Sequence, residues 1–458
     1  MADADPFEKL RRLEAHLRAN LRGQDHVLAP AAEVLVRGAH AVDPLAGLDQ
    51  VVDVLVRKGR IAAIGEGLAA PARVRVVEGE GKLLLPGFVD LHTHLRTPGR
   101  EDEEDLGTAS AAAAAGGYVA VFGMANTEPV VDSAPVLEGL ARQAAVEATV
   151  PTGFFAAMSK GLAGRQLTEM HELAATGAVG FSDDGRPVAS AQLLRRALQY
   201  VKVTDRFVAV HAQDDSLMGT GVMHEGAVSA KLGLGGIPAI AESADVARAL
   251  EVARYERGRL HLCHLSTALA LEHLARARAL DLPVTAEATP HHLTLTDEWV
   301  TTLDPNLKMN PPLRAESDRR ALVEALRSGL VDCVATDHAP HAQQEKEVPF
   351  EAAPFGTTGL ETAFAALYDG LVLTGELPLA VLVTRMSQAP ASIAGLPAPS
   401  IAVGRQADRC LVDGAARWVV EPTGLHSRSS NSAWLGQTLQ GRVTLTVAAG
   451  RVAFDDRA

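Results

Sequence analysis

The residues best suited to chemistry form a short run in which His92, His94 and Arg96 are spaced two positions apart. An apolar segment precedes them, and alternate side chains of an extended strand point to the same face. Two neutral imidazoles on one face suit a divalent transition metal, zinc in particular. A pair of ordinary polar histidines at a strand end explains the His-x-His spacing equally well. The rest of the chain must decide between these two interpretations.

Similar polar residues accompany several other apolar segments. Asp183 and Asp184 end one segment, His211 and His264 lie in two later ones, and Asp337 ends the last. Each of them alone is more often an ordinary polar residue than a ligand. Together with the first pair of histidines, they are enough to hold two metal ions that share a bridging ligand. Two such ions activate water at neutral pH and polarise a substrate carbonyl.

The elements that must position these residues alternate between strands and helices. The expected strands are 88–92, 118–124, 152–158, 178–184, 207–213, 259–265, 283–290 and 331–338. The expected helices are 106–115, 134–147, 167–175, 189–203, 243–257, 268–280 and 317–328. This alternation is typical of an α/β (β/α)₈ TIM barrel, although a doubly wound open sheet also alternates in this way. Only the barrel brings the C-terminal ends of all its strands to one mouth, so the distribution of polar residues favours the barrel.

The two ends of the chain have a different character from the middle. Short strand-like segments with tight turns lie before residue 86 and again after residue 406. We therefore expect a small β-sandwich domain built from residues 31–85 and 397–458, with the barrel over 86–396. Residues 1–30 are expected to form a helical extension, because apolar residues recur at helical spacing there.

Composition excludes several classes of function. Of the 458 residues, 47% are hydrophobic and 22% charged, which is typical of a soluble globular protein. The net charge of −13 and the absence of a basic block argue against nucleic-acid binding. The sequence has neither a signal peptide nor a membrane-spanning apolar run, so we expect a cytoplasmic protein with no membrane contact. The three cysteines are too few for a disulfide framework, and Cys263 is expected to face away from His264.

Taken in order, the polar segments resemble those of the bacterial type I dihydroorotases, which belong to the amidohydrolase superfamily. The resemblance spans roughly residues 33–450. It includes Asp-Leu-His-Thr-His-Leu-Arg at 90–96, Asn-Pro-Pro-Leu-Arg at 310–314 and Thr-Asp-His-Ala-Pro-His at 336–341. The further segments that carry it are 97–99, 124–127, 181–185, 211–214, 261–267 and 353–362. Each segment is moderately specific, and their common order is highly specific.

The resemblance implies two zinc ions and a set of ligands for them. The first metal would be bound by His92 and His94 with Asp337, and the second by His211 and His264. Many relatives bridge the two metals with a carboxylated lysine, which the fourth expected strand lacks, and Lys160 follows the third strand instead. An aspartate should therefore bridge here. Asp184 is preferred because its separation from His211 fits the family pattern, with Asp183 as the alternative.

The resemblance also implies a substrate and a reaction. The substrate-binding residues would be Arg96, Asn126, Asn310, His341, Phe355 and Gly356. Arg96 has a clear physical role, because a guanidinium binds a carboxylate in a bidentate manner and both dihydroorotate and carbamoyl aspartate carry carboxylates. A hydroxide bridging the metals would attack the ring carbonyl, and Asp337 would act as the catalytic proton shuttle. Asp90 would support a ligand rather than act as one.

Two alternatives stay open at this point. A hydantoinase, dihydropyrimidinase or allantoinase would share the fold, but such enzymes normally carry the bridging lysine and need no arginine for an exocyclic carboxylate. A non-catalytic dihydroorotase-like partner of aspartate carbamoyltransferase would have lost metal ligands, and here every expected ligand is present. The resemblance further suggests a homodimer and a possible complex with aspartate carbamoyltransferase.

Overall fold

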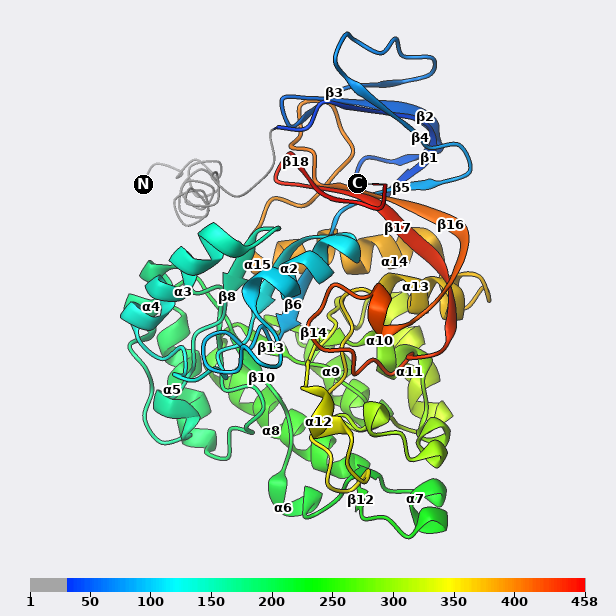
Figure 1. The fold of residues 1–458 in the computed structure, drawn as a ribbon. Helices are drawn as coiled ribbons and strands as arrows, with labels where there is room; N and C mark the ends of the chain where they lie inside the picture. The colour runs from blue at the N-terminus through cyan, green and yellow to red at the C-terminus, as the bar shows by residue number, and fades with distance from the viewer. Residues whose placement is uncertain (1–30, 458) are drawn as a thin grey trace.

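The computed structural model describes residues 31–457, and the helix expected within 1–30 lies outside this range. The described chain forms a barrel of parallel strands with surrounding helices and, beside it, a smaller β domain (Figure 1). Both ends of the described chain enter the smaller domain (Figure 1). The predicted fold class is confirmed.

Eight short, buried strands form the barrel. They are β6 (Phe88–Thr93), β7 (Tyr118–Gly123), β8 (Thr152–Phe154), β9 (Phe181–Ser182), β10 (Val208–Val210), β13 (Leu260–Leu262), β14 (Val284–Ala288) and β15 (Cys333–Val334). They pair in parallel as the ladders β6-β7-β8 and β9-β10-β13-β14-β15. Single bridges from Ala156 to Phe181 and from Thr93 to His338 join the two ladders into a closed barrel. Strands buried on both faces in this way are expected to be mostly apolar, and the polar exceptions here include Asp90 and His92 in β6 and Glu287 in β14.

Helices surround the barrel and connect its strands. The main ones are α2 (Leu106–Ala115), α3 (Ala134–Glu147), α4 (Met170–Thr176), α5 (Ala191–Val201), α8 (Ala239–Glu256), α9 (Ala268–Ala279), α11 (Glu316–Ser328), α14 (Leu379–Met386) and α15 (Gln388–Ala394). The first two have the predicted bounds. Asp105 begins α2 because its carboxylate accepts a hydrogen bond from the backbone N–H of Thr108, which is a typical N-cap.

Shorter elements lie in the connections. These are α6 (Asp215–Met218), β11 (Met223–His224), α7 (Ala227–Leu232), β12 (Gly236–Ile237), α10 (Pro290–Thr294), α12 (Gln343–Lys346) and α13 (Ala363–Leu367). Among the helices of residues 31–457, none is both long enough and apolar enough to cross a membrane.

The small domain is one sheet that draws on both parts of the chain. Its strands are β1 (Val34–Asp43), β2 (Leu48–Arg57), β3 (Arg60–Gly65), β4 (Arg75–Glu78), β5 (Leu83–Pro86), β16 (Arg409–Val419), β17 (Thr438–Ala448) and β18 (Arg451–Asp455). Their order is β18-β17-β16-β5-β1-β2-β3, with β4 beside β1. The sheet curls around a separate apolar core, so that the turn at Gly59 meets the turn at Gly450. Both turns need glycine, because a Cβ on Gly59 would lie 2.7 Å from the Gly450 carbonyl oxygen.

The connection between β16 and β17 does not stay in the small domain. Strands β16 and β17 run along the side of the barrel, where β17 contacts α13 (Figure 1). Residues 420–437 between them continue to the barrel and hydrogen-bond to the loops near Glu103, His341 and Thr357. The tail of the chain thus reaches the same end of the barrel as the candidate site.

Candidate active site

All six predicted metal-binding side chains lie together at or just beyond the C-terminal ends of the barrel strands. The Nε2 atom of His92 lies 3.3 Å from Asp184 Oδ2 and 3.5 Å from Asp337 Oδ1. The Nε2 atom of His94 lies 3.0 Å from the same Asp337 oxygen and 3.5 Å from Asp184 Oδ2. These four side chains form the first half of the cluster.

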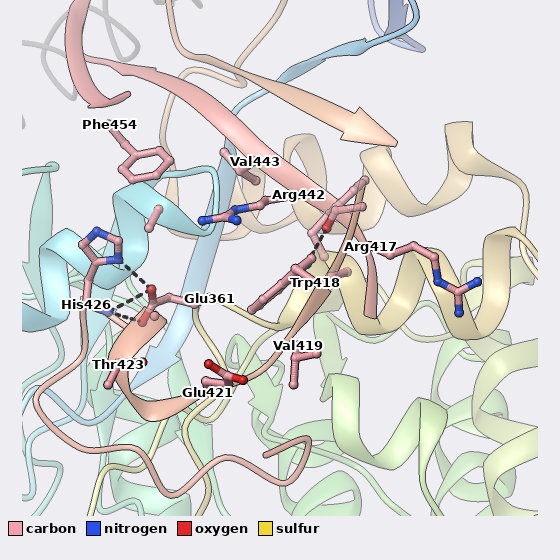
Figure 2. Close-up of a pocket in the computed structure, with 15 residues that line it drawn as sticks. Glu361, Arg417, Trp418, Val419, Glu421, Thr423, His426, Arg442, Val443 and Phe454 are labelled. Atoms are coloured by element: carbon pink, nitrogen blue, oxygen red, sulfur yellow. Dashed lines mark hydrogen bonds and ion pairs between the residues drawn. The ribbon is translucent and has the colours of Figure 1, made fainter. Parts of the chain in front are cut away.

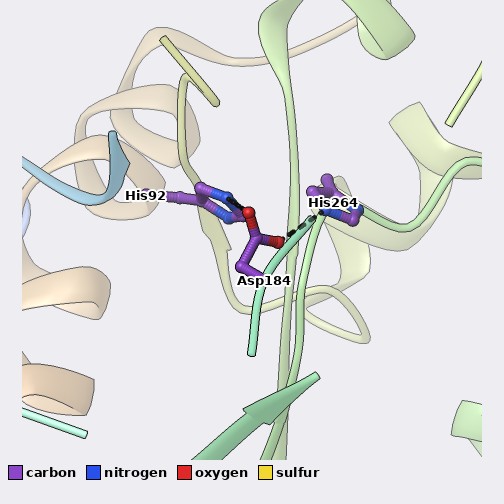
Figure 3. A group of neighbouring side chains, drawn as sticks. All are labelled: His92, Asp184 and His264. Atoms are coloured by element: carbon purple, nitrogen blue, oxygen red, sulfur yellow. Dashed lines mark ion pairs between the residues drawn. The ribbon is translucent and has the colours of Figure 1, made fainter. Parts of the chain in front are cut away.

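The second half is formed around the other oxygen of Asp184. Its Oδ1 atom lies 3.5 Å from His264 Nε2 and 3.8 Å from His211 Nδ1. The two imidazoles themselves approach to 3.0 Å between His211 Nδ1 and His264 Nε2. Figure 3 shows the Asp184 carboxylate between His92 and His264, with one oxygen directed at each ring. Asp184 is therefore the one carboxylate in contact with both halves of the cluster.

The donor atoms fit a transition-metal centre. Ligands about 2.1 Å from a tetrahedral ion lie roughly 3.4 Å from one another, which matches most of the distances in the cluster. The buried atoms His92 Nε2 and Asp184 Oδ1 have no hydrogen-bond partner in the described chain. Buried polar atoms are normally satisfied, so one unpaired atom in each half of the cluster fits a metal site in each half. Imidazole nitrogens with carboxylate oxygens are the ligand set that suits zinc.

The alternatives for the bridging residue lie elsewhere. Asp183 accepts a hydrogen bond from the Ser159 backbone N–H at 2.8 Å and another from the Ser159 hydroxyl. Its carboxylate is thus used to hold the loop after β8 and has no contact with the histidines. Lys160 is exposed on that same loop. These contacts support Asp184 as the bridge.

A buried carboxylate that sequence reasoning missed lies beneath the cluster. Glu287 in β14 contacts His92 Nδ1 at 2.7 Å and His261 Nε2 at 2.9 Å. A carboxylate only accepts hydrogen bonds, so His92 carries its proton on Nδ1 and offers the Nε2 lone pair to a metal. Burial alone would raise the pKa of Glu287, but His92 and His261 outweigh burial and lower it to about 2. The sequence feature that could have revealed Glu287 is an acidic residue inside an otherwise apolar predicted strand.

Asp90 was predicted to support a ligand, and its hydrogen bonds go to backbone groups and to a hydroxyl, not to a ligand side chain. Its carboxylate accepts hydrogen bonds from the backbone N–H groups of His92 and Thr336, both at 3.1 Å. The Thr336 hydroxyl donates a further hydrogen bond at 2.5 Å. Because His92 lies in β6 and Thr336 follows β15, Asp90 links the C-terminal ends of these two strands, where the ligands begin.

Electrostatics act differently on different ligands. Burial would lower the pKa values of His92 and His264, but nearby carboxylates, Asp184 among them, outweigh burial and raise both. The other ligands are shifted toward the forms that bind metal. Burial lowers the pKa of His211 to about 4, with a further contribution from His264, so the ring is neutral at pH 7. Burial would raise the pKa values of Asp184 and Asp337, but in both cases the nearby histidines, led by His92, outweigh it and hold the pKa below its ordinary value. Neutral imidazoles and ionised carboxylates are the forms that bind metal.

Three site residues have left-handed backbones. Their φ angles are +58° at Arg96, +31° at His264 and +50° at Asp337. Such conformations cost free energy in non-glycine residues and gather at functional sites. They also limit the strand argument used on the sequence, because β6 ends at Thr93 and strict alternation does not extend to Arg96. The guanidinium reaches the site from a loop instead.

One expectation at the residue next to His264 needs correction. Cys263 was expected to face away from the site, yet its sulfur lies within 4.8 Å of ligand atoms of His92 and Glu287. Burial raises the pKa of this thiol above its ordinary value, so it stays protonated at neutral pH. A neutral thiol beside a complete set of nitrogen and oxygen donors is a packing residue.

Arg96 is held from one side. Its Nε–H faces the Pro340 carbonyl oxygen at 3.0 Å and the Glu103 carboxylate at 2.9 Å. No hydrogen bond to another described residue engages its Nη1 or Nη2 atom. The outer edge of the guanidinium can therefore receive a carboxylate. Glu103 was not predicted, and nothing in the charged run around it distinguishes it.

The two predicted asparagines lie against metal-binding histidines. Asn126 Oδ1 accepts a hydrogen bond from His94 Nδ1 at 3.0 Å, which leaves the His94 Nε2 lone pair for a metal. Asn310 Nδ2 lies 3.4 Å from His211 Nε2, while its buried Oδ1 atom has no partner in the described chain. An unpaired buried amide oxygen at this place is available to a substrate N–H.

The last three predicted substrate-binding residues, His341, Phe355 and Gly356, lie against one another. His341 Nε2 donates a hydrogen bond to the Phe355 carbonyl oxygen at 2.8 Å, and its Nδ1 lies 3.1 Å from Glu103 Oε1. Gly356 has a φ of +138°, and a Cβ there would lie 2.8 Å from the Ala339 Cβ and 2.9 Å from His341 Nε2. Only glycine permits this approach of the two loops.

One further histidine near the cluster was missed. His291 in α10 is fully buried, and its Nε2 atom has no hydrogen-bond partner in the described chain. Burial lowers its pKa to about 4, and Asp337 acts on it in the opposite direction. Its position just beyond β14 at the end of an apolar segment was a signal of the same kind as those used for the other histidines.

Comparisons with known proteins agree with this arrangement. The family described as "Dihydro-orotase-like" matches residues 81–269. The dihydroorotase of Anaeromyxobacter dehalogenans is 44% identical over 425 residues, covering 92% of this chain and 98% of that protein. The dihydroorotase of Syntrophus aciditrophicus is 42% identical over 425 residues, covering 93% and 100%.

The fold also matches solved structures. The L-hydantoinase (dihydropyrimidinase) from Arthrobacter aurescens aligns with a TM-score of 0.82 at 24% identity, covering 93% of this chain and 96% of that one. At this identity the likeness concerns the fold alone. The curated relatives carry the closer relationship, because they align along nearly their whole length at much higher identity. The chain therefore belongs to the dihydroorotase family.

Proposed function

We propose that this protein is a dihydroorotase, which interconverts (S)-dihydroorotate and N-carbamoyl-L-aspartate in de novo pyrimidine biosynthesis. The observation that carries the proposal is the convergence of a buried His/Asp cluster with an arginine whose outer edge is free. The cluster suits hydrolysis of an amide, and the arginine suits a substrate that bears a carboxylate. Membership of the dihydroorotase family supports the same reaction.

The cluster would hold two zinc ions. His92, His94 and Asp337 would bind one, His211 and His264 the other, and Asp184 would contact both. When bound, the metals would supply a water activated at neutral pH and polarisation of the ring carbonyl. Glu287 and Asn126 would fix the tautomers of His92 and His94 through the hydrogen bonds at their Nδ1 atoms.

Asp337 would move the proton. Its side chain is 12% exposed, so it can be reached from the mouth, and its low pKa keeps it ionised and ready to accept a proton. In ring opening, water adds to the carbonyl carbon, the C–N bond breaks and the ring nitrogen needs a proton. Asp337 would take that proton from the water and deliver it to the nitrogen, and would reverse both transfers in ring closure.

The substrate carboxylate would bind to Arg96. Its Nε is engaged by Glu103 and Pro340, which leaves the outer nitrogens for a bidentate interaction. Asn310 would accept a hydrogen bond from a substrate N–H through its unpaired oxygen. His341 and the backbone at Phe355 and Gly356 would complete the pocket on the loop side.

The test is turnover of the purified, zinc-loaded protein on dihydroorotate, hydantoin and allantoin under the same conditions. We expect clear preference for dihydroorotate, because the other two rings lack the exocyclic carboxylate that Arg96 would bind. Preference for hydantoin or allantoin would assign the protein to that class of cyclic amidohydrolase instead. Absence of all turnover with metal bound would favour a non-catalytic role.

Assembly and location stay predictions of the family resemblance. We propose a homodimer located in the cytoplasm, with possible association with aspartate carbamoyltransferase. Light scattering of the purified protein measures whether it is a dimer. Co-elution with the carbamoyltransferase from a sizing column measures the association. A monomer that elutes alone would contradict both.

A further inference from the structure

Residues 426–433, which we call the clasp segment, are fixed to the barrel at their start. The Glu361 carboxylate accepts hydrogen bonds from the backbone N–H groups of His426 at 2.8 Å and Ser427 at 3.1 Å. It also contacts His426 Nδ1 at 2.9 Å. Figure 2 shows this interaction at the edge of a cavity of about 460 Å³ that lies between β16, β17 and the start of the clasp segment. The cavity has no lining residue in common with the candidate active site.

The clasp segment next contacts the loop that carries Arg96. The Arg428 backbone N–H donates a hydrogen bond to Glu104 at 3.0 Å, and the Ser427 hydroxyl donates to the other oxygen of the same carboxylate. The Ser429 hydroxyl donates to the Glu103 carbonyl oxygen at 2.6 Å. Glu103 is the residue whose side chain holds the Arg96 guanidinium. One end of the clasp segment therefore fixes the backbone beneath that contact.

Asn431 then joins the two remaining loops of the substrate side. Its Oδ1 accepts a hydrogen bond from the His341 backbone N–H at 3.0 Å. Its Nδ2 donates to the Ala339 carbonyl oxygen at 3.1 Å and to the Gly356 carbonyl oxygen at 3.3 Å. The Asn431 carbonyl oxygen accepts a further hydrogen bond from the Thr358 backbone N–H at 3.1 Å. The residue is 5% exposed, so water does not replace these bonds readily.

A single amide thus sets the distance between two loops that the proposed function assigns to the substrate. The loops pack closely, since the space beside Gly356 is filled by Ala339 and His341. Removing the Asn431 amide would leave one N–H and two carbonyl oxygens buried without partners. The loops would then have to separate to reach water, which moves the imidazole of His341 and the backbone at Gly356.

We propose that Asn431 is a positioning residue for substrate binding. It comes from the tail of the chain, touches no residue of the metal cluster, and acts through His341 and Gly356. The proposal rests on the proposed function, because that function assigns these two residues to the substrate. It predicts that loss of the Asn431 amide weakens substrate binding while the metal centre stays intact.

The variants Asn431→Ala and Asn431→Asp test the proposal, with Ser430→Ala as the matched control. Alanine removes all three side-chain bonds. Aspartate keeps the volume but places a carboxylate against the carbonyl oxygens of Ala339 and Gly356. The Ser430 side chain forms no hydrogen bond with another described residue, so its loss should change nothing. Having two variants at Asn431 keeps the test decisive if one of them does not fold.

We expect KM for dihydroorotate to rise roughly tenfold or more in both Asn431 variants, because small displacements of positioning groups have effects of this size. kcat should fall by a smaller factor, and bound zinc should match the wild type. Amide exchange in a peptide covering 338–342 should become faster, because the His341 N–H loses its acceptor. Unchanged KM and exchange, or a loss of zinc that accounts for the activity, would overturn the proposal.

The design separates this proposal from the proposed function. If the wild-type protein does not turn over dihydroorotate, the proposed function fails, and the exchange measurement still reports whether Asn431 holds the loops. If the wild type is active and the Asn431 variants have wild-type KM, only the positioning role fails. Ser430→Ala must behave as wild type in both measurements. An equal rise of KM in Ser430→Ala would mean that any change in the clasp segment disturbs the site, which overturns the specific role of Asn431.

Discussion

The two halves of the candidate site are held in place by different parts of the molecule. On the metal side, the ligands lie at or just beyond the ends of buried strands, and carboxylates inside the barrel, Glu287 and Asp90, support them. On the substrate side, Arg96, His341 and Gly356 lie on loops, and the residues that hold them come from other loops and from the tail of the chain.

This difference shows how one barrel can keep its chemistry while it changes its substrate. A metal site on strand ends needs only the barrel to be closed, because neighbouring strands already fix the ligand positions. A substrate site on loops depends on contacts between residues far apart in the chain, because these contacts fix where the loops lie. Changes on the metal side should therefore alter metal content, and changes on the substrate side should alter KM with metal retained.

The largest effect is expected for Asp184→Ala, which removes the carboxylate shared by both halves of the cluster. We expect bound zinc to fall and activity to drop by roughly 10³-fold or more, since loss of a metal removes its entire contribution to catalysis. Metal analysis of the purified variant measures the first effect. Asp183→Ala is the matched control, because its carboxylate faces Ser159, and it should keep its metal. Loss of metal only in the Asp183 variant would reverse the assignment.

Asp337→Asn should sharpen the comparison by separating metal binding from proton transfer. The amide keeps an oxygen that can bind metal but cannot carry the proton. We expect zinc to be retained and kcat to fall by about 10²–10⁴ in both directions, which is the usual contribution of general acid–base catalysis. Near-normal turnover in either direction would remove the assigned role of Asp337.

Arg96→Lys tests the substrate side directly. Lysine keeps the charge but not the planar pair of donors, and hydrogen bonds to charged groups contribute about 1.5–3 kcal/mol each. We expect KM for dihydroorotate to rise by roughly 10- to 100-fold with zinc content unchanged. Steady-state kinetics measures KM, and metal analysis of the same sample measures the zinc content. If zinc is lost with the arginine, the two halves are not independent.

Glu287→Gln should have a smaller effect that falls on the metal side. Glutamine keeps one oxygen that can accept a hydrogen bond, but its NH₂ group only donates. It therefore cannot accept hydrogen bonds from His92 and His261 at the same time. Loss of such an outer contact lowers metal affinity by about 10–100-fold, so zinc should be removed by a weaker chelator than the wild type requires. A chelator titration followed by activity measures this. An unchanged titration together with a raised KM would place Glu287 on the substrate side.

The sequence predicts which residues gather on the metal side because its signals there are local. Strand and helix alternation follows from apolar runs, and a histidine or aspartate at the end of such a run is visible without any knowledge of contacts. Glu287 was missed although it lies inside a predicted strand, because an isolated acidic residue has no motif. The positions of Arg96 and Asp337 follow from left-handed backbones, which no spacing argument includes.

The substrate side is less predictable because its supporting contacts join distant positions. Asn431 and His341 are 90 residues apart in the chain, and Arg96 meets Glu103 only because the loop after β6 turns back on itself. The tail was expected to belong to the small β domain, and its sequence gives no sign that residues 426–433 return to the barrel. Such contacts depend on the assembled fold rather than on local patterns.

The most direct test of the account is ring opening of dihydroorotate by the metal-free protein as zinc is added back. The account predicts no activity without metal, and activity that rises with zinc until about two equivalents are bound per chain. Hydantoin and allantoin should stay poor substrates at every zinc level. Full activity in the metal-free protein, or a zinc-loaded protein that does not act on dihydroorotate, would contradict the account.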